Sequence, residues 1–525
     1  MKIRNCYSIA VGMGLGALAA AANAQVQVLE PAQPVQAFYP ATSPTTATTT
    51  PNSTAASLAA GQPMLNQVVE RAITTHPEIQ ARYHDFVDSL EGQNVARAGW
   101  RPQLSASGWT GKEWRSNVDS QPSSNWSRTG WSLELRQLLF DGGATTGRIR
   151  QFGFEKLAKY YDLHATTNNL ANEVIAAYLD VQRYREMRSL AEENYNMHNT
   201  TLVQLRERQE SGVGRGVDME QANGRLSLAQ TNLMTESNNL NDVTQRYRRL
   251  VGEYPPANLE SVNEIVAGLP VIGQTENFGD ALRINPSILS KQALVQASQA
   301  GQKVAQAAHA PTLDARASTG RDRDQPGAMY RNVQSSRVQL MLTYPIYRGG
   351  GDAARIRQVA AQTYAAQDVR DYTCRNVQQE LSVAWNNIMR IRQQMPFLRE
   401  HELSTSKVRV AYLQQYRIGQ RSLLDLLDTE NELFDARRAM INATYELRKA
   451  EYYWMSLSSQ ILPTLGLAQP YSDSQPDEQQ ALVLPDDPLR ACMDTLPDTS
   501  NLVPVVATQV VTPPAGALPM QRTAP

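Results

Sequence analysis

The sequence predicts an α+β membrane protein in which each chain contributes four strands to a shared barrel that long helices continue. Three observations predict this fold class. Residues 63–466 contain an internal two-fold sequence repeat. Each half carries two segments that alternate apolar and polar residues, the pattern of a strand with one apolar face. Each half also carries 67 residues with almost no proline, which predicts a helix roughly 100 Å long.

The first 24 residues have the pattern of a secretory signal peptide. Lys2 and Arg4 precede a short apolar stretch, and Ala22-Asn23-Ala24 has the small residues of a cleavage site. An uncleaved anchor is the less favoured alternative, because the apolar stretch is shorter than the ~20 residues that span a bilayer. Cys6 lies in a context unlike that of a lipoprotein cysteine, so we expect no lipid anchor.

Two further segments cannot build a core by composition. Residues 25–62 form a low-complexity leader, and residues 467–525 form a proline-rich C-terminal tail. Both are predicted to be disordered. The sequence gives no role for the tail.

Composition and motif searches exclude several function classes. The 50 basic and 51 acidic side chains leave almost no net charge, which argues against a nucleic-acid partner. The six histidines are scattered, and the sequence contains no HExxH, P-loop or GxSxG motif. Outside the signal peptide only Cys374 and Cys492 remain, which predicts neither a disulfide framework nor a CxxC metal site. We therefore expect no enzyme activity, catalytic residue, metal site or cofactor.

The repeat fixes the boundaries of the two halves, residues 63–270 and 271–466. Landmarks recur at an offset of 207 to 209 residues: His76-Pro77 with Asn285-Pro286, Gly142-Gly143 with Gly349-Gly350, and Gly212 and Asp218 with Gly419 and Asp425. Chance similarity would not keep one register over so many sites. Both halves should therefore contain the same elements in the same order.

Each half is predicted to open with a helix and continue into two strands. The helices cover about 64–98 and 279–308 and end before Pro102 and Pro311, because proline cannot continue a helix. The strand pattern is clearest where one set of apolar residues alternates with polar neighbours: Trp131, Leu133, Leu135, Ala315, Ala317, Val338, Leu340 and Leu342. Polar segments at about 116–127 and 320–334 should be hairpin loops.

The first hairpin is rich in tryptophan. Trp109, Trp114, Trp126 and Trp131 cluster there, as residues at a membrane interface do. A soluble sheet that packs these side chains in a core is the alternative. The strands alone favour neither interpretation.

After each glycine pair a long helix is predicted, at 144–210 and 351–417. Apolar residues recur at spacings of three and four in the first: Val174, Tyr178, Val181, Tyr184, Met187 and Leu190. This stripe is typical of helices that pack side by side. Turns at 211–216 and 418–422 should lead into return helices at about 217–252 and 423–460.

Four strands cannot form a closed barrel in lipid. An open sheet there would leave backbone groups unpaired at a cost of several kcal/mol each, and spanning barrels have at least eight strands. Three chains would supply twelve strands, which predicts a trimer. A periplasmic coiled-coil scaffold without a pore is the alternative from a different class.

Three motifs carry a resemblance to a known family: Leu139-Phe140-Asp141-Gly142-Gly143, Tyr344-Pro345-Ile346-Tyr347-Arg348-Gly349-Gly350, and the segment from Tyr416 to Asp428. With them, residues 63–466 resemble TolC-like outer-membrane efflux and type I secretion channels. The resemblance implies a homotrimer with a twelve-stranded barrel in the outer membrane and a long α-helical barrel across the periplasm. It also implies two partners, a periplasmic adaptor (membrane fusion) protein and an inner-membrane ABC transporter, or an RND pump in the alternative.

The resemblance also suggests where the periplasmic gate lies. Tyr416 and Arg421 match the family pattern in the second half, and Asp218 matches in the first. We expect Tyr416 and Arg421 to tether to Asp218 or to nearby backbone in the closed state. The alternative is that Ser422 with Asp425, and Asp218 with Gln221, simply cap helices.

Two further sets of residues belong to this end of the molecule. Asp425 and Asp428 are expected to line the lumen as acidic rings, because clustered carboxylates set the ion preference of a constriction. Gly212, Gly214 and Gly419 are expected to form the tips that contact the adaptor, although turn geometry alone would also explain them.

The sequence favours a type I secretion channel that exports an unfolded protein, a large adhesin or toxin. The missing lipoprotein cysteine and the resemblance to TolC-like members support this prediction. The outer component of a tripartite small-molecule efflux pump is the alternative, since its architecture is the same.

Overall fold

A computed structural model describes residues 64–482, except 116–123, 213–214, 263–275 and 325–330. The predicted signal peptide, the leader and the tail beyond residue 482 lie outside the described residues. Among the helices that are described, none combines the length and the apolar character needed to cross a membrane.

Each half opens with two helices rather than the one predicted. α1 (Leu65–Thr75) is followed by α2 (Pro77–Ala98), and α5 (Glu276–Ile284) by α6 (Pro286–Ala307). The break falls at His76 and at Asn285, whose ψ angles of 129° and 120° are extended. A proline excludes the preceding residue from the helical region, and it then occupies the first position of the next helix.

The four strands form one antiparallel sheet in the order β1-β2-β3-β4. They are β1 (Gln103–Arg115), β2 (Ser124–Phe140), β3 (Thr312–Asp324) and β4 (Arg331–Thr343). The strands reach further into the hairpins than predicted, so residues 320–324 and 331–334 belong to strands. β1 and β4 are the two edges of this sheet.

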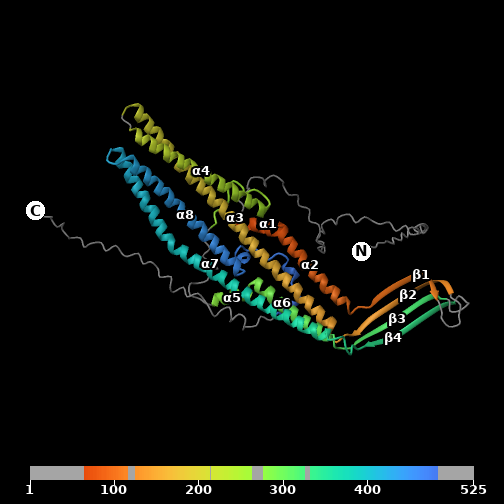
Figure 1. The fold of residues 1–525 in the computed structure, drawn as a ribbon. Helices are drawn as coiled ribbons and strands as arrows, with labels where there is room; N and C mark the ends of the chain where they lie inside the picture. Colours follow the sequence, from red (N-terminus) through yellow and green to blue (C-terminus); the bar gives the residue numbers. More distant parts are fainter. Residues whose placement is uncertain (1–63, 116–123, 213–214, 263–275, 325–330, 483–525) are drawn as a thin grey trace, which may run out of the picture. The chain divides into compact units, whose positions relative to one another are not determined.

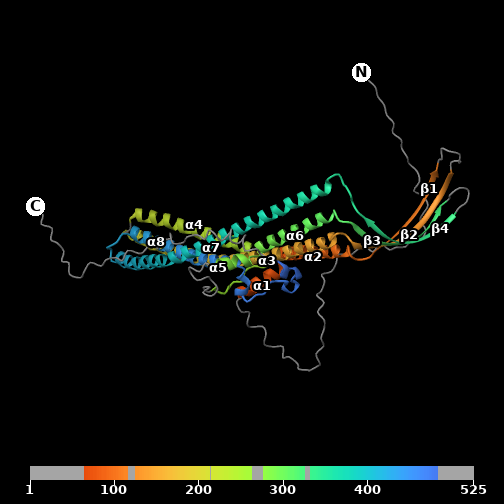
Figure 2. The ribbon, with the colours of Figure 1, turned by 90° about the horizontal axis from the view of Figure 1, so that it is seen from below.

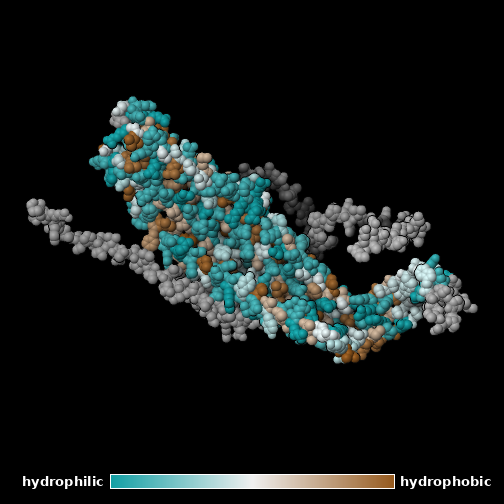
Figure 3. All heavy atoms as spheres, viewed as in Figure 1, coloured by the Kyte–Doolittle hydropathy of each residue, from teal (hydrophilic) through white to brown (hydrophobic). Residues whose placement is uncertain are grey.

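The register gives the sheet one apolar and one charged face. Leu104 lies opposite Leu135, and Ala317 lies between Leu135 and Val338. The opposite face carries cross-strand ion pairs, including Arg128 with Asp322 at 2.6 Å and Arg136 with Asp314 at 3.0 Å. Figure 3 shows apolar surface gathered at the helix-proximal end of the strands.

The tryptophans of the first hairpin divide between these two faces. Trp114 and Trp131 lie on the apolar face and are exposed. Trp109 and Trp126 lie on the charged face, where a Cβ on Gly130 would meet the Trp109 ring at 2.5 Å. Only Trp114 and Trp131 are therefore placed as the predicted interfacial anchors would be, because successive side chains of a strand point to opposite faces.

The two long helices have the predicted bounds: α3 is Ala144–Glu210 and α7 is Gly351–Arg417. The return helices are α4 (Gly216–Val251) and α8 (Leu423–Leu457). The strands lie at one end of α3 and α7, and the α3–α4 and α7–α8 turns lie at the other (Figures 1 and 2). α3 contacts α2 and α6 toward the strands and α4 and α8 toward the turns.

The largest apolar core lies midway along α3. Val174, Tyr178 and Val181 of the predicted stripe are fully buried there, together with Leu381 and Ile388 of α7. Met187 is buried and Tyr184 and Leu190 are half-buried, so the stripe is confirmed as a packing face. Both repeats contribute to this core.

Part of the predicted disordered tail is packed onto the helices. After α9 (Ile461–Thr464), the turns at Ser472–Ser474 and Asp477–Ala481 follow the surface. Glu478 forms an ion pair with buried Lys156 at 2.8 Å, and Tyr471 stacks on Tyr83 with ring centroids 3.8 Å apart. The prediction was wrong for residues 467–482, because a buried ammonium needs an anion and composition does not reveal such a contact.

The structure adds one observation about the cysteines. Cys374 of α7 is buried and forms a disulfide bond. Cys6 and Cys492, the other two cysteines of the sequence, lie outside the described residues. A single bond of this kind fits an oxidising compartment, although it is not a disulfide framework.

Candidate functional site

The candidate site lies at the two helix turns, each of which contains a glycine in the left-handed conformation directly after the long helix. Gly212 and Gly419 have φ angles of +78° and +76°, a left-handed conformation that favours glycine at a helix end. The amide of Gly212 donates to Gln209 O, and that of Gly419 donates to Tyr416 O. The turn geometry of these two glycines is therefore confirmed, whereas Gly214 lies outside the described residues.

The second turn leads into a fully capped helix. The Ser422 hydroxyl accepts from the amide of Asp425 at 3.2 Å, and the Asp425 carboxylate accepts from the amide of Ser422 at 3.4 Å. The predicted capping pair is thus confirmed. The hydrogen bond with Ser422 lowers the pKa of Asp425 below its ordinary value, and the Arg421 guanidinium adds to the effect.

The helix that follows the first turn has no capping box. The N-cap position of α4 is Arg215, whose side chain makes no capping hydrogen bond. Asp218 is the third residue of α4, and its amide donates to Arg215 O at 3.2 Å. The alternative that Asp218 caps α4 together with Gln221 is therefore wrong, since Asp218 lies inside the helix.

Arg421 contacts its own hairpin. Its guanidinium lies 3.6 Å from the Asp425 carboxylate, donates to Gln415 Oε1 at 3.1 Å, and lies 4.3 Å from the centroid of the Tyr412 ring. Within one chain, the structure does not bring Arg421 to Asp218. The arginine is held at the turn by residues of α7 and α8.

Tyr416 contacts the first repeat through an arginine that sequence reasoning missed. Arg208, near the end of α3, donates to the Tyr416 hydroxyl at 3.0 Å, and its guanidinium lies 5.4 Å from the ring centroid. This contact joins α3 to α7, and it takes the place of the expected contact with Asp218. The repeat gave no signal for it, because the residue that corresponds to Arg208 is the uncharged Gln415.

Asp428 also has a partner in the first repeat. Arg225 of α4 forms an ion pair and hydrogen bond with Asp428 of α8. Sequence reasoning placed Asp428 in an open acidic ring and overlooked Arg225. Asp425 and Asp428 therefore differ in this structure, since the first is bound within its own helix start and the second across the two hairpins.

A small apolar cluster lies between these polar contacts. Its buried members come from α3, α4 and α8: Leu202, Leu205, Ala222, Leu423 and Leu427. Met219, Leu226 and Tyr416 pack against it from the side. The hairpin ends are thus joined by a few leucines and two cation contacts.

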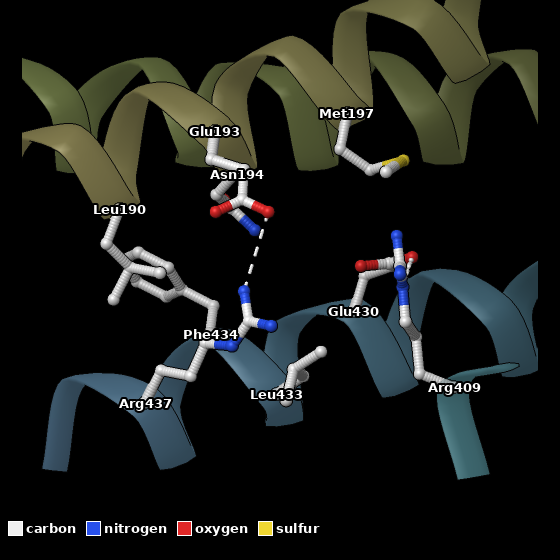
Figure 4. A pocket seen from close by; sticks show the side chains of 9 residues that line it. All are labelled: Leu190, Glu193, Asn194, Met197, Arg409, Glu430, Leu433, Phe434 and Arg437. Carbon is white, nitrogen blue, oxygen red and sulfur yellow. Dashed lines mark hydrogen bonds and ion pairs between the residues drawn. The ribbon is translucent and has the colours of Figure 1, made fainter. Parts of the chain in front are cut away.

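Farther from the turns than this cluster, α3, α7 and α8 enclose a shallow pocket (Figure 4). Arg437 reaches Glu193 at 3.5 Å, and Arg409 is paired with Glu430 at 2.7 Å. Phe434 is one of the apolar side chains that line the pocket. The cavity volume is about 30 Å³, which holds a water molecule or two but no drug-sized ligand.

Metal chemistry finds no support in the part of the chain that the structure describes. No group of three or more His, Cys, Asp or Glu side chains is placed there to hold a metal ion. The contacts at the turns are reversible hydrogen bonds and ion pairs.

Comparison with known proteins gives a consistent result. The family model described as outer membrane efflux protein matches residues 68–253 and 278–453, one match in each repeat. The chain is 25% identical over 363 residues to the outer membrane efflux protein BepC of Brucella suis, covering 69% of this chain and 78% of BepC. It is 25% identical over 406 residues to the outer membrane protein TolC of Escherichia coli, covering 73% and 79% of the two chains.

Two further similarities bear on function and on fold. The proteases secretion protein PrtF of Dickeya chrysanthemi is 23% identical over 339 residues, covering 62% of this chain and 71% of PrtF. The solved structure of the CmeC outer membrane channel of Campylobacter jejuni superposes with a TM-score of 0.69 at 15% identity, covering 81% of this chain and 89% of CmeC. At that identity the superposition establishes the fold.

Proposed function

This chain belongs to the outer membrane efflux protein family, and from that premise we propose that it is the outer-membrane channel-tunnel subunit of a type I secretion system. In this role it exports an unfolded protein from an ABC exporter and its periplasmic adaptor across the periplasm and the outer membrane. The alternative is the outer-membrane component of a tripartite small-molecule efflux pump, with an RND pump as the inner-membrane partner.

The observation that carries the channel proposal is the four-stranded sheet with edges at β1 and β4. Each edge leaves a row of backbone donors and acceptors that lipid cannot satisfy. Pairing β1 of one copy with β4 of the next closes the sheet, and three copies give a twelve-stranded barrel. The apolar face carrying Leu133, Leu340 and Trp131 then faces lipid, and the face carrying Arg128 and Asp322 faces the lumen.

The helix turns form the periplasmic gate in this proposal. Arg421 and Tyr416 hold the closed state, with Asp218 of a neighbouring copy as the partner of Arg421. Asp425 faces the lumen as an acidic ring. Gly212, Gly214 and Gly419 lie at the tips that contact the adaptor.

Protein secretion and small-molecule efflux each have support among the relatives. PrtF is named for protease secretion, and BepC is named for efflux. A deletion strain separates the two roles: loss of a secreted protein with unchanged drug susceptibility supports secretion, and the reverse result supports efflux.

The channel itself is tested on purified full-length protein. We expect a trimer in detergent and ion conductance in planar bilayers. A monomer that leaves bilayers silent would refute the proposal. Within a conducting trimer, Arg421→Ala and Asp218→Ala should each raise conductance, and unchanged conductance in both variants discards the tether.

A further inference from the structure

We propose that Arg225 is a latch residue that holds the two hairpins of one chain together at the gate and neutralises Asp428. The inference deepens the proposed channel function and rests on it. It assigns a role to a side chain outside the family motif from Tyr416 to Asp428. It also reduces the expected pair of acidic rings to one, that of Asp425.

The geometry of the ion pair fits a latch. Arg225 lies in the third turn of α4 and Asp428 in the second turn of α8, so their contact joins the two return helices close to the turns. Their side chains are 34% and 52% exposed. An ion pair with this exposure contributes little free energy, which suits a contact that has to break and re-form.

The surroundings of the pair keep it in register. Ala222, one turn before Arg225, and Leu427, next to Asp428, are both buried in the apolar cluster. Separation of the hairpins would therefore expose the cluster and break the ion pair together. The Arg208–Tyr416 contact lies on the α3–α7 side of the same cluster.

The internal repeat shows that the pair is specific to one combination of halves. At the offset of 207 residues, Arg225 corresponds to Glu432 and Asp428 corresponds to Gln221. The first half therefore supplies the cation and the second half the anion. Neither half carries both charges at these two positions.

The pair also affects ion preference. Asp428 bound to Arg225 adds no net charge to the lumen, while the Asp425 carboxylate accepts a hydrogen bond from the Ser422 amide and lies near the Arg421 guanidinium, which both favour its ionised form. Opening that breaks the latch releases three carboxylates and three guanidinium groups in a trimer. Loss of Arg225 alone would leave only the carboxylates, and acidic rings favour cations.

Two single substitutions distinguish the effect of the ion pair on channel closure from its effect on the charge of the lumen. Arg225→Gln and Asp428→Asn should both raise the open fraction in planar bilayers, because both break the same contact. An exposed ion pair changes an equilibrium by up to about fivefold, so three copies multiply to roughly a hundredfold at most. The reversal potential should move in opposite directions, toward cations in Arg225→Gln and away from cations in Asp428→Asn.

Two double variants complete the test. Arg225→Gln with Asp428→Asn should keep the raised open fraction and show wild-type ion preference, and its effect on opening should be smaller than the product of the single effects. The charge exchange Arg225→Asp with Asp428→Arg should restore the low open fraction. Arg249→Gln is the matched control, because it removes an exposed α4 ion pair with Glu173 of α3 and should leave both readouts unchanged.

The outcomes distinguish failure of the latch from failure of the channel. If wild-type protein conducts while both single variants behave like wild type, Arg225 is not a latch. If the charge exchange stays as open as the single variants, the contact has no role in closure. If wild-type protein itself does not conduct as a trimer, the proposed function fails before Arg225 is tested.

Discussion

The middle of the helical region and its turn-bearing end are held together by different interactions. In the middle, Val174, Ile175 and Tyr178 of α3 are completely buried among side chains of both repeats. At the turns, the hairpins meet through five small or medium apolar side chains and through exposed cation contacts at Tyr416 and Asp428. The same two hairpins are therefore packed tightly in one place and loosely in another.

This difference separates stability from opening. A buried Leu, Ile or Val contributes about 1.5–3 kcal/mol, whereas an exposed ion pair contributes about 0.2–1 kcal/mol. A partner that separates the hairpin ends has to overcome only the second kind of interaction and a small apolar contact. The middle can stay packed while the ends move, and the following variants test that division.

The largest effect should come from a cavity in the middle. Ile175→Ala removes three carbons from a side chain that is 0% exposed, and such a change costs about 2–5 kcal/mol. We expect the midpoint of thermal unfolding of the detergent-solubilised protein to fall clearly. Circular dichroism at 222 nm measures it.

The matched variant at the turn end is Leu427→Ala. Leu427 belongs to a much smaller apolar cluster than Ile175 does. Hydrogen exchange should accelerate at the amides that begin α8, while the global midpoint stays close to wild type. A global midpoint that falls as far as in Ile175→Ala would show that the turn end unfolds together with the middle, and would remove the distinction between the two regions.

The second largest effect concerns acid sensitivity near the middle. Burial lowers the pKa of His164 to about 4, and its Nε2 is buried without a hydrogen-bond partner among the described residues. In the unfolded chain the imidazole takes up a proton near pH 6.5, whereas in the folded chain it stays neutral down to about pH 4. The free energy of unfolding therefore has its full value above pH 6.5 and decreases as the pH falls toward 4. The loss amounts to about 3 kcal/mol at most.

Replacement by an aromatic ring that cannot titrate isolates this effect. His164→Phe keeps contact with Tyr160, whose ring centroid is 4.3 Å from that of His164. It should make the unfolding midpoint less dependent on pH between 6.5 and 4. The exposed His84→Gln variant is the control and should retain the wild-type slope. An unchanged slope in His164→Phe would assign the acid sensitivity to other groups.

Much of the fold could be predicted from the sequence, because it follows from periodicity and from the repeat. The bounds of the long helices, 144–210 and 351–417, agree with α3 and α7 to the residue. The breaks before Pro77 and Pro286 were missed although the prolines were noticed, since the helical pattern continues on both sides. The packing of Glu478 on Lys156 could not be predicted, because it joins residues 322 positions apart.

The site was predicted less completely. Ser422 and Asp425 were recognisable, because a capping box is a local pattern. Arg208 and Arg225 were missed, because their partners lie in the other repeat and depend on the packing of two hairpins. Comparison of the repeats residue by residue would have found the opposite charges of Arg225 and Glu432.

A smaller effect should come from the cap of the second turn. Ser422→Ala removes the acceptor for the Asp425 amide, and loss of an N-cap costs about 1 kcal/mol. Hydrogen exchange at the Asp425 amide should accelerate about fivefold. Ser227→Ala, an exposed serine within α4, is the control, and equal acceleration in both variants would argue against a specific role of the cap.

The smallest effect tests whether the first turn can be made like the second. Arg215 occupies the N-cap of α4 without a side-chain cap, and Asp218 already lies at the third helical position. Arg215→Ser therefore installs the arrangement of Ser422 and Asp425 and should slow exchange at the amide of Asp218, with a gain of about 0.5–1 kcal/mol. Arg215→Ala, which supplies no acceptor, controls for loss of the arginine. If both variants behave alike, the two turns differ in more than the capping residue.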